Sequence, residues 1–138
     1  AWLQLYNLAK SKEVELYIDS SGFVPNSKFA GLYVNSHAVI CASLVESSTA
    51  VFPEAFLSKR PLLVSNRDFA TELCGDAALY FDPLDEKSIA DAIFEIVTNE
   101  PLRDELVKRG TKVLHANYPS AVSKWEMQRK LINELVNK

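Results

Sequence analysis

The chain has 138 residues, of which 48% are hydrophobic and 24% are charged, and its net charge is −3. This length and balance predict one globular domain, residues 1–138, with one hydrophobic core. The slight acidity argues against a nucleic-acid partner, because proteins that bind phosphate backbones usually carry a basic excess.

The cysteines and the ends of the chain bear on where the protein works. Cys41 and Cys74 stand far apart and form no CxxC pair, which favours a reducing, cytoplasmic setting over a disulfide scaffold. No apolar stretch approaches the ~20 residues that cross a bilayer, and no signal peptide is visible. The chain opens on Ala1-Trp2-Leu3 without an initiator methionine, so we expect it to be a piece of a longer protein.

The first third of the chain predicts two helices around one strand. Residues 2–10 have a helical pattern, residues 14–18 alternate with the period of a strand, and Ser20-Ser21-Gly22 ends that strand. A second helix is predicted from Asn26, its expected N-cap, to about residue 36. Its apolar face is formed by Phe29, Leu32 and Tyr33.

The remainder alternates apolar runs with helical patterns. Residues 38–42, 62–64 and 78–81 predict strands, and the nearly continuous run 38–42 is typical of a strand buried on both faces of a parallel sheet. The predicted helices span residues 50–59, 67–74, 86–98, 102–116 and 120–137. This order predicts an α/β fold, a Rossmann-like parallel sheet flanked by helices. The last three helices should pack on the sheet edge or reach toward a neighbouring domain.

In an open parallel sheet, ligands bind beyond the carboxyl ends of the strands. The loops to inspect are therefore residues 19–24, 43–49, 65–67 and 82–85. The second is the most informative, because a small polar loop after a strand feeds a helix with Pro53 in its first turn. Free N–H groups and the helix dipole make such a junction an anion site, framed here by Glu46 and Glu54. The plainer alternative is that Ser48 or Thr49 is an ordinary N-cap and Glu54 a solvated helix residue.

An ordered series of motifs surrounds these two glutamates. Seven residues separate Glu46 from Glu54. Around them stand, in order, Gly22-Phe23-Val24-Pro25, Leu32-Tyr33, Ala42-Ser43-Leu44-Val45-Glu46, Pro53-Glu54-Ala55-Phe56, Arg60-Pro61-Leu62-Leu63-Val64-Ser65 and the run from Gly75 to Asp85. In this series the chain resembles the C-terminal, donor-binding domain of group 1 (family 4) glycosyltransferases of the GT-B fold. The resemblance covers nearly the whole chain.

The resemblance implies a role for each matching residue. Glu46 would contact the transferred sugar as the catalytic residue, and Glu54 would accept hydrogen bonds from the ribose hydroxyls. Backbone amides of Ser47, Ser48, Thr49 and Ala50 would hold the diphosphate, and Gly22, Phe23 and Val24 would border the nucleobase. Such enzymes transfer a sugar from a nucleotide-diphosphate sugar to a glycan or glycolipid with retention of configuration, and need no metal cofactor. The implied context is polysaccharide biosynthesis, in which the parent protein could touch a membrane surface.

Three departures from the family pattern stand out. The loop between the glutamates reads Ser-Ser-Thr-Ala where glycines are common, so the backbone approaches phosphates less freely. Pro53 directly precedes Glu54, where many members place it earlier. The first strand, which supplies a basic pair to the diphosphate, has no match here, nor has the N-terminal acceptor domain. We therefore expect a fragment that binds the donor but is inactive alone.

Several residues outside the glutamate loop also suggest roles. Asp82 and Asp85 could suggest a metal site, but Asp85 as the N-cap of the next helix is favoured. Ser47, Ser48 and His37 make no hydrolase without a G-x-S-x-G elbow, and His37 and His115 are isolated. Trp125 is interpreted as core rather than as a ligand platform. Two alternatives for the whole protein stay open: a GT-B-like sugar-nucleotide epimerase and a non-catalytic α/β interaction module.

Overall fold

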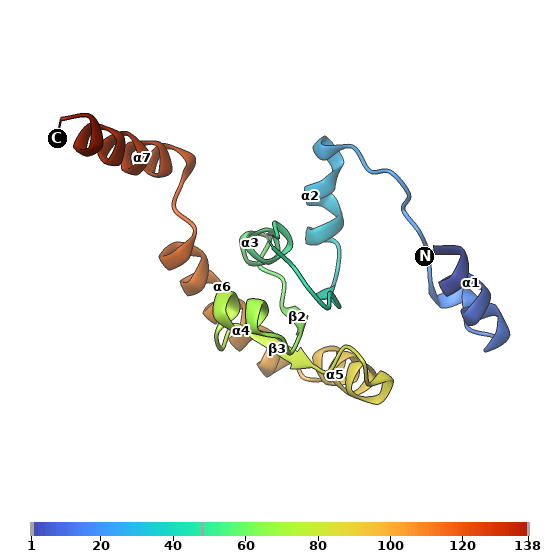
Figure 1. The fold of residues 1–138 in the computed structure, drawn as a ribbon. Helices are drawn as coiled ribbons and strands as arrows, with labels where there is room; N and C mark the ends of the chain where they lie inside the picture. Colours follow the sequence, from blue (N-terminus) through green and yellow to red (C-terminus); the bar gives the residue numbers. More distant parts are fainter. Residues whose placement is uncertain (1, 48, 138) are drawn as a thin grey trace.

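A computed structural model describes residues 2–47 and 49–137 (Figure 1). The chain begins with α1 (Trp2–Ser11), a 3-10 turn η1 (Glu15–Tyr17) and α2 (Asn26–Val34). The central elements are β1 (Val39–Cys41), α3 (Val51–Leu57), β2 (Leu62–Ser65), α4 (Asp68–Cys74) and β3 (Ala78–Phe81). Three helices follow: α5 (Glu86–Thr98), α6 (Glu100–Asn117) and α7 (Ala121–Val136). No helix among the described residues is long and apolar enough to cross a membrane.

The sheet is parallel and has the order β1-β2-β3. Ile40 pairs with Leu63 in β2, and Leu63 pairs in turn with Leu79 in β3. The central strand β2 is buried along its whole length, as its apolar sequence predicts for a strand covered on both faces. The predicted α/β class and parallel sheet are therefore confirmed.

Two hydrophobic clusters cover the two faces of the sheet. On one face α3 and α4 pack Phe52, Phe56 and Cys74 against Leu62 and Val64. On the other face α5 and the first half of α6 pack their side chains against the sheet. This second cluster is formed by Leu63, Phe81, Ala92, Ile96 and Leu106. Helix α6 reaches both clusters, because Val113 and Leu114 near its end pack on the first one.

Gly110 lets α6 approach α3 closely. A Cβ at this position would lie 2.5 Å from Cδ1 of Phe56, so only glycine fits without a shift of the ring. Phe56 itself is almost fully buried in the first cluster. The close approach thus places α3, and with it the loop before α3, firmly against the body of the domain.

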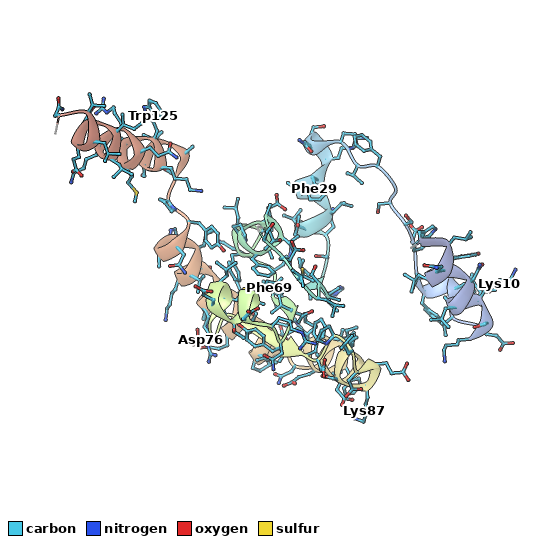
Figure 2. The ribbon with its side chains drawn as sticks, viewed as in Figure 1. Lys10, Phe29, Phe69, Asp76, Lys87 and Trp125 are labelled. Carbon is cyan, nitrogen blue, oxygen red and sulfur yellow. The ribbon has the colours of Figure 1, made fainter. Side chains whose placement is uncertain are left out.

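The terminal helices α1 and α7 lie apart from the sheet, at opposite ends of the molecule (Figure 1). Helix α7 has no buried residue, and Trp125, labelled on it in Figure 2, is 60% exposed. The prediction that Trp125 is a core residue is therefore wrong. Its helix has an apolar face, but no other described element packs against that face. Of the three last helices, α5 and α6 pack on the sheet and α7 reaches away from it.

Two boundary predictions are also wrong. Residues 14–18 do not form a strand, because no neighbouring strand pairs with them. Their backbone groups are satisfied locally instead, with Tyr17 N–H donating to the carbonyl of Val14 at 3.1 Å. Asn26 is the first residue of α2 rather than its N-cap. Pro25 occupies the cap position with extended backbone (φ −60°, ψ 143°) and without a side-chain cap bond.

Strand β1 is less buried than its sequence predicts. Cys41 is buried on the face covered by α3, but Ile40 on the opposite face is 47% exposed. Helices α5 and α6 cover that face at β2 and β3, where Leu63 and Phe81 are buried. The cover does not extend over β1, and the predicted burial on both faces holds for β2 only.

Candidate functional site

The carboxyl ends of the three strands place three loops along one edge of the sheet. Two of these loops are joined directly. Asn66 N–H donates to the carbonyl of Phe81 at 2.7 Å, and the Arg67 guanidinium lies 3.4 Å from the Asp82 carboxylate. Both charged groups are partly exposed, so the ion pair contributes little to stability. These contacts hold the loop after β2 against the loop after β3.

Asp82 and Asp85 have structural partners. Asp85 Oδ1 accepts a hydrogen bond from Lys87 N–H at 2.9 Å, which confirms it as the N-cap of α5. Asp82 accepts from Leu84 N–H as well as from Arg67. Among residues 2–47 and 49–137, no group of three or more His, Cys, Asp or Glu side chains converges as metal ligands would. His37 and His115 lie exposed on separate segments.

The loop from β1 to α3 carries Glu46 on a short chain of polar contacts. Ser43 Oγ donates to Glu46 Oε1 at 2.8 Å, and Cys41 Sγ lies 3.6 Å from the same hydroxyl. Cys41 is buried at the end of β1, whereas Ser43 and Glu46 are half-buried. The carboxylate of Glu46 is thus held at the mouth of the loop, with one oxygen committed to Ser43 and the other without a described partner.

Helix α3 begins directly after this loop. Ala50 is its N-cap, and Thr49 Oγ1 accepts a hydrogen bond from Val51 N–H at 3.1 Å. Pro53 contributes no N–H to the first turn. The helix end therefore offers fewer free donors to a phosphate than its sequence predicts. Ser48, one of the predicted phosphate-binding residues, lies outside the described residues, while Ser47 is exposed just before it.

Glu54 lies in α3 and faces α2. Tyr33 Oη donates a hydrogen bond to Glu54 Oε2 at 2.9 Å. Burial first, and then the hydrogen bond and charge of Glu54, raise the pKa of Tyr33 to about 12. The alternative that Glu54 is a plain solvated residue is therefore wrong, because its side chain is half-buried and has a specific partner.

A cavity of about 380 Å³ opens beside this hydrogen bond, between α2 and α3. Phe29 and Tyr33 meet edge to face in its wall, with ring centroids 5.7 Å apart. The full lining is Asn26, Phe29, Ala30, Tyr33, Glu54, Leu57 and Ser58. An aromatic wall with one carboxylate and one amide is the composition of a site for a polar ring-bearing ligand.

Residues 22–24, which are predicted to border the nucleobase, are not among the residues that line this cavity. Gly22, Phe23 and Val24 belong to the extended connection between η1 and the start of α2 (Figure 1). Gly22 has a positive φ of 57°, and Phe23 is 93% exposed. No hydrogen bond among the described residues joins this segment to residues 43–47 or 49–50. The structure thus brings Glu54 together with α2 rather than with residues 22–24.

The structure gives two further residues a role in this site. The sequence pattern places Tyr33 only on the apolar face of its helix and Ser43 only within the matching loop. Each provides a hydroxyl to one of the two glutamates. The signal in the sequence was the polar tip of Tyr33 on an otherwise apolar face, since a buried phenol usually finds a hydrogen-bond partner.

A larger hollow, about 920 Å³, runs along α7. Its lining residues, among them Arg129, Leu131 and Glu134, all come from that helix and its C-cap Asn137. A recess that no second element encloses cannot orient a small ligand. The cavity between α2 and α3 is therefore the better candidate, although it is smaller.

A parallel sheet of three strands, covered by helices on both faces and with its loops at the carboxyl edge, defines the open α/β class of domain. The family described as glycosyl transferases group 1 matches residues 3–113. The chain belongs to this family. Its fold is also that of part of sucrose-phosphate synthase from Thermosynechococcus elongatus, with a TM-score of 0.84 and 17% sequence identity. The likeness covers 98% of this chain and 34% of the synthase chain.

Among proteins with curated descriptions, none is significantly similar to this chain in sequence. The chain spans about a third of the length of the solved synthase that it matches. The fold is that of a GT-B fragment, and the predicted family is confirmed.

Proposed function

We propose that this chain is the donor-binding part of a retaining glycosyltransferase. In this proposal the complete protein transfers a sugar from a nucleotide-diphosphate sugar to a glycan or glycolipid acceptor. Family membership supports glycosyl transfer as the activity of the parent protein. The free cysteines Cys41 and Cys74 agree with a reducing compartment such as the cytoplasm.

One observation carries the proposal: Glu46 and Glu54 stand on either side of the α3 N-terminus, each already oriented by a hydroxyl from the protein. Ser43 holds the first carboxylate and Tyr33 the second. Among the described residues each carboxylate has one hydrogen-bonded oxygen, and its other oxygen could accept hydrogen bonds from a ligand. Sugar and ribose hydroxyls are donors of the kind that such oxygens bind well.

The two carboxylates would bind different parts of the nucleotide sugar. Glu54, beside the cavity lined by α2, would accept hydrogen bonds from the ribose hydroxyls. Glu46, before α3, would face the transferred sugar, and the diphosphate would lie between them at the helix N-terminus with the amides of Ser47, Thr49 and Ala50. Positive helix-end potential would then stabilise charge that develops on the departing diphosphate.

Other segments of a longer protein would supply the remaining parts of the site. These are the first strand with its basic pair and the acceptor-binding domain. Because the diphosphate would meet only the short helix α3 in this chain, we expect the 138-residue chain to have no transferase activity by itself. Measured turnover by this chain alone would overturn that expectation.

The test is a ligand-observed NMR screen against UDP, GDP and ADP. We expect one of them to bind and Glu54→Ala to weaken its affinity about 10- to 100-fold, since each charge-assisted hydrogen bond contributes ~1.5–3 kcal/mol. Glu72→Ala, an exposed carboxylate on α4, is the matched control and should bind as the native chain does.

A second comparison separates the two glutamates. Glu46→Ala should weaken binding of the nucleotide sugar but leave binding of the nucleoside diphosphate unchanged, because only the sugar would touch Glu46. If neither this chain nor a longer protein that contains it binds any of the three nucleotides, the donor-site proposal is wrong. A non-catalytic interaction module would then fit better.

A further inference from the structure

Glu54 does not meet solvent freely, because a phenol from another helix occupies one of its oxygens. Tyr33 lies in the last turn of α2, and its hydroxyl donates to Glu54 Oε2 across the α2–α3 contact at 2.9 Å. Both side chains line the same cavity and both are half-buried. Phe29, one turn earlier, packs edge-on against the Tyr33 ring.

The direction of this hydrogen bond cannot reverse under ordinary conditions. A carboxylate can only accept, and the pKa of Tyr33 is raised to about 12, first by burial and then by Glu54. The phenol therefore keeps its proton at neutral pH. It acts as a fixed donor that selects one orientation of a carboxyl group whose last torsion is otherwise broad.

We propose that Tyr33 is a positioning residue, which holds the Glu54 carboxylate in the orientation that receives the ribose hydroxyls of the nucleotide. This inference rests on the proposed donor site. With Oε2 bound to the phenol, Oε1 has no hydrogen-bond partner among the described residues and would receive the two vicinal hydroxyls. A carboxylate oriented before binding loses less rotational freedom when the ligand arrives.

A purely structural role is the competing explanation, in which the hydrogen bond only ties α2 to α3. A second contact argues against it. The Arg60 guanidinium, in the connection between α3 and β2, donates to the carbonyl of Val34 at the end of α2. Helix α2 therefore has a second tie, to the α3–β2 connection, in addition to Tyr33. Loss of the phenol hydroxyl should leave the helix in place and free only the carboxylate.

The experiment compares two ligands in four proteins. The ligands are whichever of UDP, GDP and ADP binds, and its 2′,3′-dideoxy counterpart, which lacks the hydroxyls that Glu54 would receive. The proteins are the native chain, Tyr33→Phe, Glu54→Ala and the double variant. Tyr80→Phe is the matched control, because it removes a phenol that donates to the backbone of Gly75 outside the site.

We expect Tyr33→Phe to weaken binding of the ribonucleotide about 3- to 10-fold, the usual range for ordering one flexible side chain. Its affinity for the dideoxy nucleotide should be unchanged. In the Glu54→Ala background the same substitution should have no further effect, because there is no carboxylate left to orient. Tyr80→Phe should bind both ligands as the native chain does.

Two results would overturn the inference while leaving the donor site intact. One is an equal loss of affinity for both nucleotides in Tyr33→Phe, which would indicate a displaced helix. The other is an undiminished loss in the Glu54→Ala background. If the native protein binds none of the nucleotides, the proposed donor site itself fails and this inference fails with it.

Discussion

The sheet with α3–α6 and the terminal helices α1 and α7 carry apolar faces of the same kind, but only the first region buries them. In the central region Phe52 and Leu62 are fully buried. In the terminal helices Trp2 is 42% and Trp125 60% exposed. Hydrophobic periodicity therefore predicts the helix in both regions. Burial also requires a facing element, which the sheet supplies in the central region. In the terminal region the short turn η1 contacts α1, where Ala9 is buried, and α7 has no buried residue.

The two regions consequently depend on different interactions. The central region is stabilised by apolar area removed from water, about 25 cal/mol for each Å². Helix α7 relies on local interactions, such as Ser120 Oγ, which accepts a hydrogen bond from Ser123 N–H at 3.1 Å. Such caps and exposed helix pairs contribute little each, so α7 should unfold separately from the sheet.

The largest expected effect is that of Phe52→Ala in the central region. Phe52 is fully buried, and its ring stacks on Phe69 with centroids 6.3 Å apart. We expect a loss of about 3–5 kcal/mol in the free energy of unfolding, because the substitution leaves a cavity. Urea denaturation followed by far-UV circular dichroism measures it. Trp125→Ala, the control in α7, should change this free energy by less than about 0.5 kcal/mol. Comparable losses in the two variants would contradict the division into two regions.

Gly110→Ala should have the next largest effect. Its new Cβ would lie 2.5 Å from the Phe56 ring, and overpacking of this kind costs about 1–3 kcal/mol. Gly31→Ala is the matched control within α2, where a Cβ would have no neighbour within 4 Å. There the substitution should stabilise the chain by about 0.5–1 kcal/mol, since alanine favours a helix interior over glycine. Thermal denaturation of both variants would reveal the opposite signs.

Substitutions at two helix N-caps, one in each region, should have smaller effects on the free energy of unfolding. Asp85 caps α5, which packs on the sheet, so Asp85→Ala should lower the free energy of unfolding by about 1 kcal/mol. Ser120 caps α7, which packs on nothing described. Ser120→Ala should therefore reduce the helical circular-dichroism signal without moving the urea midpoint of the central region. A shift of that midpoint by the same amount would mean that α7 is coupled to the sheet.

Much of the central region could be predicted from the sequence, because its signals are local. The apolar runs of β2 and β3 and the helical spacing of α5 each reveal their own element. Their alternation predicts the parallel sheet and its ligand-binding edge. The N-cap role of Asp85 also follows from local chemistry. By contrast, residues 14–18 have the alternation of a strand but no partner strand, so pattern alone was misleading there.

The contacts of the candidate site could not be predicted in the same way. The hydrogen bond between Tyr33 and Glu54 spans 21 positions of the sequence and depends on how α2 packs against α3. The exposure of Ile40 likewise depends on how far α5 and α6 extend over the sheet. The family motif marks Glu46 and Glu54 as a pair, while only the three-dimensional packing shows which hydroxyl meets each of them.

The smallest expected effect is confined to alkaline pH and concerns Tyr80, whose hydroxyl donates to the carbonyl of Gly75 at 2.6 Å. Burial is the main cause that raises the pKa of Tyr80 to about 12, from an ordinary value of 10.0. Below pH 10 the phenol is protonated in both states, so its contribution to stability is complete. Between pH 10 and 12 the unfolded chain releases this proton while the folded chain retains it, so stability falls as the pH rises.

Tyr80→Phe should therefore unfold more easily than the native chain at pH 8, and the difference should shrink as the pH approaches 12. Urea midpoints measured at intervals from pH 8 to about pH 12 would show this convergence, as the titration of one buried phenol requires. Tyr6→Phe in α1 removes one tyrosine from the terminal region and corrects for the lost chromophore. If the two midpoints stay equally far apart at every pH, the Tyr80 hydroxyl contributes the same amount throughout, and its titration does not explain the loss of stability. The alkaline loss of stability would then have to come from other groups of the central region, of which the buried thiol of Cys74, with its pKa raised to about 12, is the first to test.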